Sequence, residues 1–117
     1  MKLKEIADAL KAKFVCCPDM ADIEIKSACG CDIMSDVLAF VKDQGVLLTG
    51  LCNPQVVRTV IMLDMKAIVF VRGKQPDENT VALAARYGIP LLTTEHSMFV
   101  ACGLLFAQGL SGGNAAK

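Results

Sequence analysis

Apolar side chains in the first part of the chain recur first at helical spacing and then at strand spacing. Residues 3–10 (LKEIADAL) carry apolar side chains at i, i+3, i+4 and i+7, which predicts a short amphipathic helix. Residues 14–16 (FVC) predict a brief strand that ends before Pro18. Residues 23–28 (IEIKSA) alternate apolar and polar side chains, which predicts a half-exposed strand near a sheet edge. Ser35 is placed to cap a helix that ends near Gly45.

Three short apolar runs come after Gly45, and each is followed by a helical pattern. The runs are residues 46–48, 67–71 and 89–92. Alternating strands and helices at this spacing indicate parallel strands joined by right-handed crossovers. The sequence therefore predicts an α/β fold: one compact domain over residues 1–110, with a mainly parallel central sheet and helices on both faces. Residues 111–117 are expected to form a flexible tail.

Capping residues mark the ends of the expected helices. Asn53-Pro54 and Gln75-Pro76 each place a proline at the first helical position. Gly88 suits the left-handed conformation that ends a helix. The last helix is expected to be capped by one of the two threonines at 93–94.

Polar residues follow each of the three expected strands, where the strand meets the next helix. Because parallel strands bring their carboxyl ends to one edge of the sheet, we expect these residues to line a common rim, where ligands of open α/β sheets bind. Hydroxyls, glycines, an arginine and unpaired helix N–H groups are suited to a small anion. The candidate ligand-binding residues are Thr49, Gly50, Asn53, Arg72, Gly73, Thr93, Thr94 and Ser97.

The same residue types also make ordinary turns and caps, so a purely structural rim is the alternative interpretation. Neither G-x-G-x-x-G nor G-x-x-x-x-G-K-[ST] occurs, so the nucleotide-binding motifs of defined mechanism are absent from the sequence. Arg72 is the residue that separates the two interpretations, because an arginine at a strand end is costly to order unless an anion pairs with it. That anion is either a ligand or the carboxylate of Asp77 or Glu78.

Charge and hydropathy exclude several classes of partner. Twelve basic residues balance twelve acidic ones, which leaves no electrostatic basis for binding nucleic acid or anionic lipid. The longest apolar run, residues 97–110, is too short to span a bilayer. The chain opens on an amphipathic pattern without a signal peptide. We therefore expect a cytoplasmic protein that contacts neither nucleic acid nor membrane.

Six cysteines are a high number for an intracellular chain of 117 residues. We expect them to be free thiols that pack as small hydrophobic side chains. The C-x₂-C spacing of zinc and iron–sulfur ligands does not occur, so we expect no metal and no cofactor. Cys52 precedes a helix N-terminus, which favours the thiolate, and His96 lies at another junction of the rim. A Cys52–His96 nucleophile pair is the alternative to a protein without catalytic residues.

Residues 97–110 are apolar on nearly every side of the expected last helix. A terminal helix in so small a domain rarely finds cover all round, so we expect this helix to form the contact of a homodimer. Gly103 would allow another backbone to approach it closely.

Three segments, LLTGLCNP (47–54), AIVFVRGKQPDENTVALAARYGIPLLTT (67–94) and SMF (97–99) before the apolar helix, together resemble the DRTGG domain family. The resemblance implies an α/β domain like those found beside phosphotransacetylase and in pyrophosphatases with CBS pairs, similar also to the N-terminal domain of HPr kinase/phosphorylase. In those settings the domain is a regulatory or oligomerising module. Some stand-alone members accompany iron-hydrogenase components in anaerobic bacteria, which suits a chain rich in thiols.

The motif that names the family is incomplete in this sequence. Leu47-Leu48 precede Thr49-Gly50 where the family has Asp-Arg, and Leu51 stands in place of the second glycine. The resemblance therefore implies the fold and a regulatory role, but it does not transfer a binding site.

Together these observations predict a non-enzymatic, dimerising module that senses a small anionic metabolite or nucleotide. One alternative is an interaction subunit that docks to a partner enzyme in a larger redox or metabolic complex associated with hydrogenase. The other is a small enzyme that uses Cys52 or His96 on phosphorylated or acyl substrates.

Overall fold

The strands form one mainly parallel sheet in the computed structural model, which describes residues 1–41 and 44–113. The strand order is β1-β5-β4-β3-β2; β1 runs antiparallel to β5, and the other neighbouring pairs are parallel. The strands are β1 (Lys13–Cys16), β2 (Ala28–Gly30), β3 (Val46–Thr49), β4 (Ala67–Phe70) and β5 (Leu91–Thr93). The helices are α1 (Leu3–Leu10), α2 (Met34–Phe40), α3 (Pro54–Met62), α4 (Glu78–Tyr87), α5 (Met98–Ala107) and the short 3₁₀ helix η1 (Pro18–Met20).

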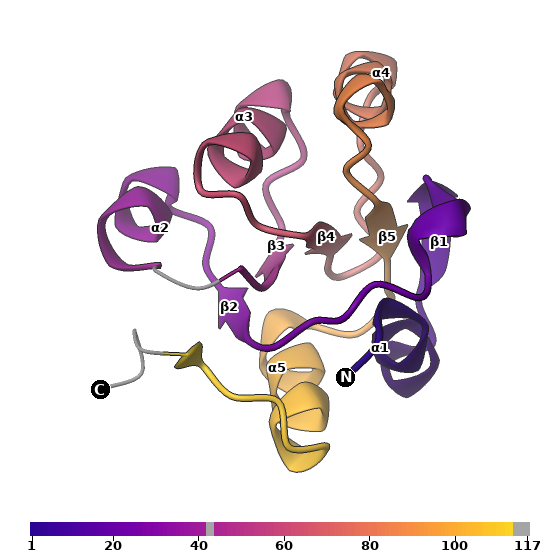
Figure 1. The fold of residues 1–117 in the computed structure, drawn as a ribbon, viewed down its shortest axis with the longest axis vertical. Helices are drawn as coiled ribbons and strands as arrows, with labels where there is room; N and C mark the ends of the chain where they lie inside the picture. The colour runs from indigo at the N-terminus through magenta and orange to yellow at the C-terminus, as the bar shows by residue number, and fades with distance from the viewer. Residues whose placement is uncertain (42–43, 114–117) are drawn as a thin grey trace.

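Helices cover both faces of this sheet, as predicted. Figure 1 shows α2, α3 and α4 on one face and α1 and α5 on the other. Because successive side chains of a strand point to opposite faces, each central strand supplies two cores. In β3, Val46 and Leu48 pack toward α1 and α5, whereas Leu47 packs toward α2 and α3. Every residue of β3 and β4 is buried, which explains why both strands are continuous apolar runs in the sequence.

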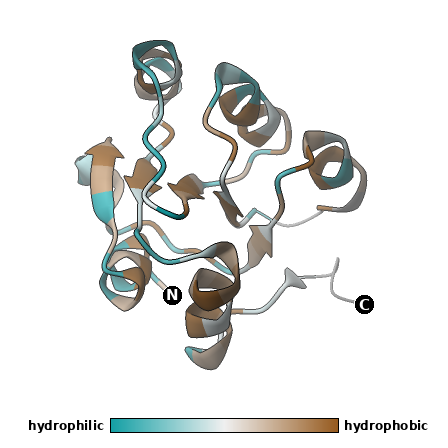
Figure 2. Ribbon diagram, turned by 180° about the vertical axis from the view of Figure 1, so that it is seen from behind, coloured by the Kyte–Doolittle hydropathy of each residue, from teal (hydrophilic) through white to brown (hydrophobic). Residues whose placement is uncertain are grey.

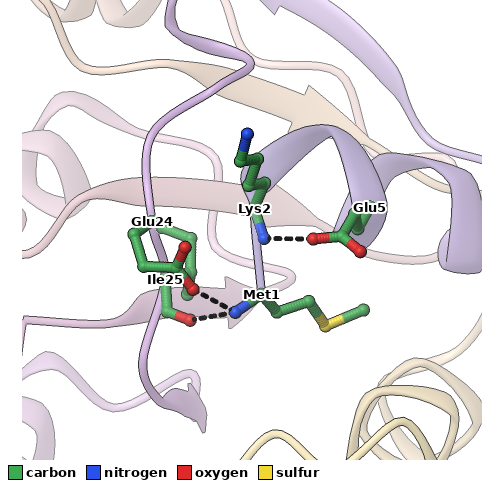
Figure 3. Close-up of polar contacts among 5 residues, drawn as sticks. All are labelled: Met1, Lys2, Glu5, Glu24 and Ile25. Atoms are coloured by element: carbon green, nitrogen blue, oxygen red, sulfur yellow. Dashed lines mark hydrogen bonds and ion pairs between the residues drawn. The ribbon is translucent and has the colours of Figure 1, made fainter.

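The strand predicted at residues 23–28 is wrong in its position, because β2 begins only at Ala28. The alternating residues form an extended segment along the N-terminus instead. Figure 3 shows the Met1 ammonium group donating to the Glu24 carboxylate and to the Ile25 carbonyl oxygen, and the Ile25 N–H donates back to the Met1 carbonyl oxygen (2.7 Å). Ile25 is fully buried in the core beside α1. Its burial therefore comes from packing on α1, and not from a place in the sheet.

Two of the expected helix starts are also wrong. α2 follows Ile33, so Ser35 lies inside the helix and does not cap it. α5 is capped by Ser97, whose hydroxyl accepts from the Val100 N–H (3.3 Å), and neither threonine of the pair 93–94 has this role. The starts were misplaced because several nearby residues can act as caps, and packing of the helix decides which of them does.

The other two starts and the expected stop agree better with the structure. Asn53 is the N-cap of α3 and Pro54 its first residue, although the Asn53 side chain makes no capping hydrogen bond. The start at Pro76 is wrong by two residues, because α4 begins at Glu78 and is capped by Asp77. Gly88 ends α4 in the left-handed conformation (φ 69°), as predicted.

The chain remains paired with the sheet at the first residue of the predicted tail. The Ser111 carbonyl oxygen accepts from the Ala28 N–H (2.9 Å) and forms a bridge beside β2. Of the predicted tail, residues 114–117 lie outside the described residues. Within the described ranges, none of the helices has the length and apolar character that crossing a bilayer requires.

Candidate functional site

The loops that follow β3, β4 and β5 are joined to one another by backbone hydrogen bonds. The Val71 N–H donates to the Thr49 carbonyl oxygen (3.1 Å), which ties the ends of β4 and β3 together. The Gly73 N–H donates to the Thr94 carbonyl oxygen (2.8 Å), which ties the loop after β4 to the loop after β5. The candidate residues of the three junctions therefore lie along one edge of the sheet, which we call the rim. That they bind a ligand stays a prediction.

At the first junction the polar groups are engaged by a carboxylate from another loop. Asp32 follows β2, and its Oδ1 accepts from the Gly50 N–H (2.7 Å) and from the Thr49 hydroxyl (2.9 Å). The Thr49 hydroxyl in turn accepts from the Leu51 N–H (3.1 Å), and Thr49 is fully buried. An anion from the protein itself thus occupies the donors that were predicted to bind an external anion.

Asp32 is a rim residue that the sequence analysis missed. Because the strand was placed at residues 23–28, position 32 did not fall at a strand end. In the structure β2 ends at Gly30, so Asp32 lies two residues after a strand. The other rim residues likewise lie at or just after the carboxyl end of a strand. The sequence feature that could have indicated Asp32 is the pair Gly30 and Asp32 after an apolar segment. This feature is not specific, because glycine and aspartate are also common in turns.

Asn53 completes the first junction. Its side-chain Oδ1 is buried and has no hydrogen-bond partner among the described residues. A buried polar atom without a partner is unusual in folded proteins. The side chain was expected either to cap α3 or to bind a ligand, and it does not cap the helix.

At the second junction Arg72 has an exposed side chain on a tightly held backbone. Its φ of 57° is left-handed, and its N–H donates to the His96 carbonyl oxygen (2.7 Å). Among the described residues Arg72 forms no ion pair, so the salt bridge to Asp77 or Glu78 that was its alternative role is not present. The Arg72 guanidinium is therefore left available at the rim.

Gly73 and Lys74 extend this junction. Gly73 is also left-handed (φ 68°), and a Cβ at this position would collide with the Glu95 carboxylate. The Lys74 side chain is exposed, and its carbonyl oxygen accepts from the Thr93 hydroxyl (2.9 Å). Glycine is favoured here because its left-handed φ is a conformation that residues with a side chain rarely adopt.

At the third junction the hydroxyls serve the fold. The Thr94 side chain is buried, and its hydroxyl donates to the carbonyl oxygen of Leu10 at the end of α1 (2.7 Å). It also accepts from the His96 N–H (3.3 Å). Because Ser97 caps α5, the hydroxyls of Thr94 and Ser97 both have internal partners. Among the described residues of the rim, the cationic side chains with free capacity are those of Arg72 and Lys74.

Charges of both signs surround Cys52 at the start of α3. Burial raises the pKa of the Cys52 thiol; Lys74 lowers this pKa, whereas Asp32 and Asp77 raise it further. The helix N-terminus was expected to favour the thiolate, but the net shift of the pKa is in the opposite direction. The thiol donates weakly to the Gly50 carbonyl oxygen (3.7 Å). These observations do not favour Cys52 as a nucleophile.

All six cysteines are free thiols. Burial also raises the pKa of Cys29 and Cys102, and burial together with a hydrogen bond to Cys17 raises the pKa of Cys16 to about 11. Within residues 1–41 and 44–113, no group of three or more His, Cys, Asp or Glu side chains is arranged to hold a metal ion.

No family model matches the sequence, and no curated protein matches it. Among solved structures, the chain is similar to the CBS and DRTGG domains of the regulatory region of Clostridium perfringens pyrophosphatase, in complex with the activator diadenosine tetraphosphate. The TM-score is 0.74 at 20% sequence identity, over 95% of this chain. The chain spans about half the length of that solved chain, 48% of which is covered. This likeness confirms the predicted DRTGG-like α/β fold.

Proposed function

We propose that this chain is a non-enzymatic regulatory module that senses a small anionic ligand, a nucleotide or another phosphorylated metabolite, at the rim. The observation that carries the proposal is Arg72. Its backbone is held in place by the loop after β5, while its side chain is exposed and has no ion pair among the described residues. Lys74 lies two residues away with an exposed side chain. Two cations on an ordered loop are suited to a phosphate group.

The position of Asp32 narrows where such a ligand would bind. The Asp32 carboxylate engages the Gly50 N–H, so a second anion at Gly50 would meet a like charge. We therefore place the phosphate at the exposed side chains of Arg72 and Lys74, and not against Gly73, where the Glu95 carboxylate lies. Of the eight candidate residues, Thr49, Thr94 and Ser97 then act by shaping the loops, because their hydroxyls are engaged internally.

The solved neighbour supports this choice of ligand. That solved structure is of a regulatory region in complex with diadenosine tetraphosphate, an activator that carries several phosphate charges. A regulatory neighbour also favours a module without catalysis, and the raised pKa of Cys52 argues in the same direction. We further propose that the module works in the cytoplasm as a homodimer formed through α5, whose aromatic side chains Phe99 and Phe106 are exposed.

Ligand-dependent thermal stability tests the proposal. Diadenosine tetraphosphate, ATP and inorganic phosphate would each be titrated while unfolding is followed. A ligand at about 100 times its Kd raises the free energy of unfolding by about 2.7 kcal/mol, which increases the melting temperature by several degrees. Arg72→Ala should remove most of this increase, and Arg72→Lys should retain part of it, because lysine keeps the charge but loses the planar guanidinium.

Arg86→Ala is the matched control for Arg72. Arg86 is an exposed cation in the last turn of α4, at the far end of that helix from the loop that carries Arg72. Its loss should leave the ligand-induced increase intact. If none of the three probes raises the melting temperature, or if the Arg72 variant responds like the wild type, the ligand-sensing proposal is refuted. An interaction subunit that docks to a partner enzyme through α5 would then be favoured.

A further inference from the structure

A carboxylate lies beside the two cations of the rim. Glu95 is exposed in the loop after β5, and its carboxylate carbon and both oxygens lie within 3.3 Å of the place where a Cβ of Gly73 would be. Gly73 stands between Arg72 and Lys74, in the segment from β4 to α4 that Figure 2 shows mostly in teal, the hydrophilic colour. The proposed phosphate site therefore has a negative group at its side.

Two backbone hydrogen bonds hold Glu95 in this position, one on each side of it. The carbonyl oxygen of Thr94 accepts from the Gly73 N–H (2.8 Å), and that of His96 accepts from the Arg72 N–H (2.7 Å). Both bonds join backbone atoms, so the loop after β5 and the loop after β4 form one ordered surface. The Glu95 carboxylate and the two cations are presented together on this surface.

The three charged side chains do not neutralise one another by direct contact. Among the described residues, the Glu95 carboxylate forms no ion pair with Arg72 or with Lys74. The guanidinium and the ammonium group are hydrogen-bond donors that suit a phosphate, whereas an ionised carboxylate can only accept hydrogen bonds. The surface therefore offers donors for an anion and, next to them, an acceptor for a group that carries a hydrogen.

A bare phosphate ion does not complement this surface. It would bind the two cations but would also meet the like charge of Glu95, which weakens its binding. A phosphate ester with free hydroxyl groups complements it better, because a hydroxyl can donate to the carboxylate in a charge-assisted hydrogen bond. The ribose of a nucleotide provides such hydroxyls close to its phosphate. In dinucleotide-binding folds, an acidic side chain near the phosphate site recognises ribose in this way.

We propose that Glu95 determines the specificity of the rim. Its carboxylate accepts hydrogen bonds from the hydroxyls of a sugar phosphate, the ribose phosphate part of a nucleotide, and disfavours inorganic phosphate. This role rests on the proposed function, which supplies the phosphate at Arg72 and Lys74. It adds the chemical group that lies beside the phosphate and the residue that recognises this group.

Removal of the ribose hydroxyls tests this role on the wild type. Isothermal titration calorimetry would measure the affinities for ATP, for dideoxy-ATP, which lacks both ribose hydroxyls, and for inorganic phosphate. ATP should bind about tenfold more tightly than dideoxy-ATP, because only ATP can donate to the Glu95 carboxylate from its ribose. Ribose phosphate, which has hydroxyls but no base, should also bind more tightly than inorganic phosphate. A larger gain for ATP would identify nucleotides as the preferred class.

Glu95→Ala should have opposite effects on two of these probes. The affinity for inorganic phosphate should increase about threefold, because the like charge is removed. ATP should lose its advantage over dideoxy-ATP. Asp19→Ala is the matched control, since it removes an exposed carboxylate from η1, at the opposite edge of the sheet, where the antiparallel β1 ends. It changes the net charge equally and should leave the preference for ATP intact.

Equal affinities of the wild type for ATP and dideoxy-ATP would overturn this role of Glu95, and so would a Glu95→Ala variant that keeps the wild-type preference. The comparison on the wild type needs no variant, so it is decisive even if Glu95→Ala does not fold. If both nucleotides bind equally and Arg72→Ala weakens both, the phosphate site stands and only the role of Glu95 is refuted. If no probe binds, the phosphate site itself is refuted.

Discussion

The hydroxyl of Thr94 connects two segments that are far apart in the sequence. It donates to the carbonyl oxygen of Leu10, 84 residues away, and joins the end of α1 to the segment after β5. At the first junction of the rim, Asp32 similarly holds Thr49 and Gly50, which follow it by 17 and 18 residues. Such single polar contacts position the loops, whereas the exposed side chain of Arg72 forms no ion pair among the described residues. A structural residue and a ligand-binding residue should therefore respond differently to substitution.

Thr94→Val should destabilise the protein without changing ligand binding. Valine keeps the shape but leaves the buried Leu10 carbonyl oxygen without a donor, which costs about 1–3 kcal/mol. Urea denaturation would measure this loss. Thr93→Val is the control, since the Thr93 hydroxyl is partly exposed and its acceptor, the carbonyl oxygen of Lys74, can bind water. Equal losses for the two variants would contradict the structural role assigned to Thr94.

Two of the helices that start at the rim, α3 and α4, have different N-terminal caps. Asp77 caps α4 by accepting from the Thr80 N–H (2.8 Å) and from the Thr80 hydroxyl (2.7 Å), and these bonds lower the pKa of Asp77. The N-cap side chain of α3 makes no such bond, and this helix is held by its buried valines. α4 buries only Thr80 and Ala84, so it depends more on its cap.

Asp77→Ala should lower the free energy of unfolding at neutral pH, because the capping hydrogen bonds from Thr80 are lost. The effect depends on pH. Because the pKa of Asp77 is lowered on folding, its stabilisation is present above the unfolded value of 3.8 and is lost as the pH falls through the folded value. Wild type and variant should therefore converge in stability in acid. Glu78→Ala, in the same first turn, keeps the cap and is the control. A constant difference across the acid range would show that the ionised cap is not responsible.

At the scale of the whole molecule, the apolar composition is explained by a sheet that is covered on both faces. β3 and β4 are buried on both sides, and partly buried thiols complete the two cores: Cys102 on the side of α1 and α5, and Cys16, Cys29, Cys31 and Cys52 on the other. Four of these thiols have a raised pKa because of burial. The folded protein therefore keeps protons that the unfolded chain gives up.

Stability should consequently fall in alkaline solution. Thiols of the unfolded chain ionise near pH 9.0, whereas Cys16 in the folded chain ionises at about 11. Its contribution is fully present below pH 9.0 and is lost as the pH rises through the folded value. Urea midpoints between about pH 8 and about pH 10.5, with reductant present, would measure this loss. Cys16→Ala should flatten the dependence, and Val15→Ala controls for lost packing on β1. If Cys16→Ala and wild type show the same slope, burial of this thiol is not the cause.

Much of the fold follows from patterns that are local to a segment. The apolar runs of β3, β4 and β5, the amphipathic α1 and the Gly88 stop of α4 were all read correctly, because burial on one or both faces imposes a periodicity within a few residues. The placement of the three junctions along one rim followed as well, since parallel strands with helical crossovers leave no other arrangement.

The local patterns did not decide which side chains at the rim are free. Ile25 alternates as a strand residue would, but it packs on α1, and the resulting shift of β2 concealed Asp32. The hydroxyl of Thr94 is engaged by Leu10, whereas Arg72 lacks the ion pair that its neighbours in sequence suggested. For Ile25 and Thr94 the partner lies in a distant part of the chain. For Arg72 the carboxylates nearby in the sequence do not form the expected ion pair. The tertiary structure decided these roles, because a hydrogen bond or an ion pair depends on which distant atoms folding brings within reach.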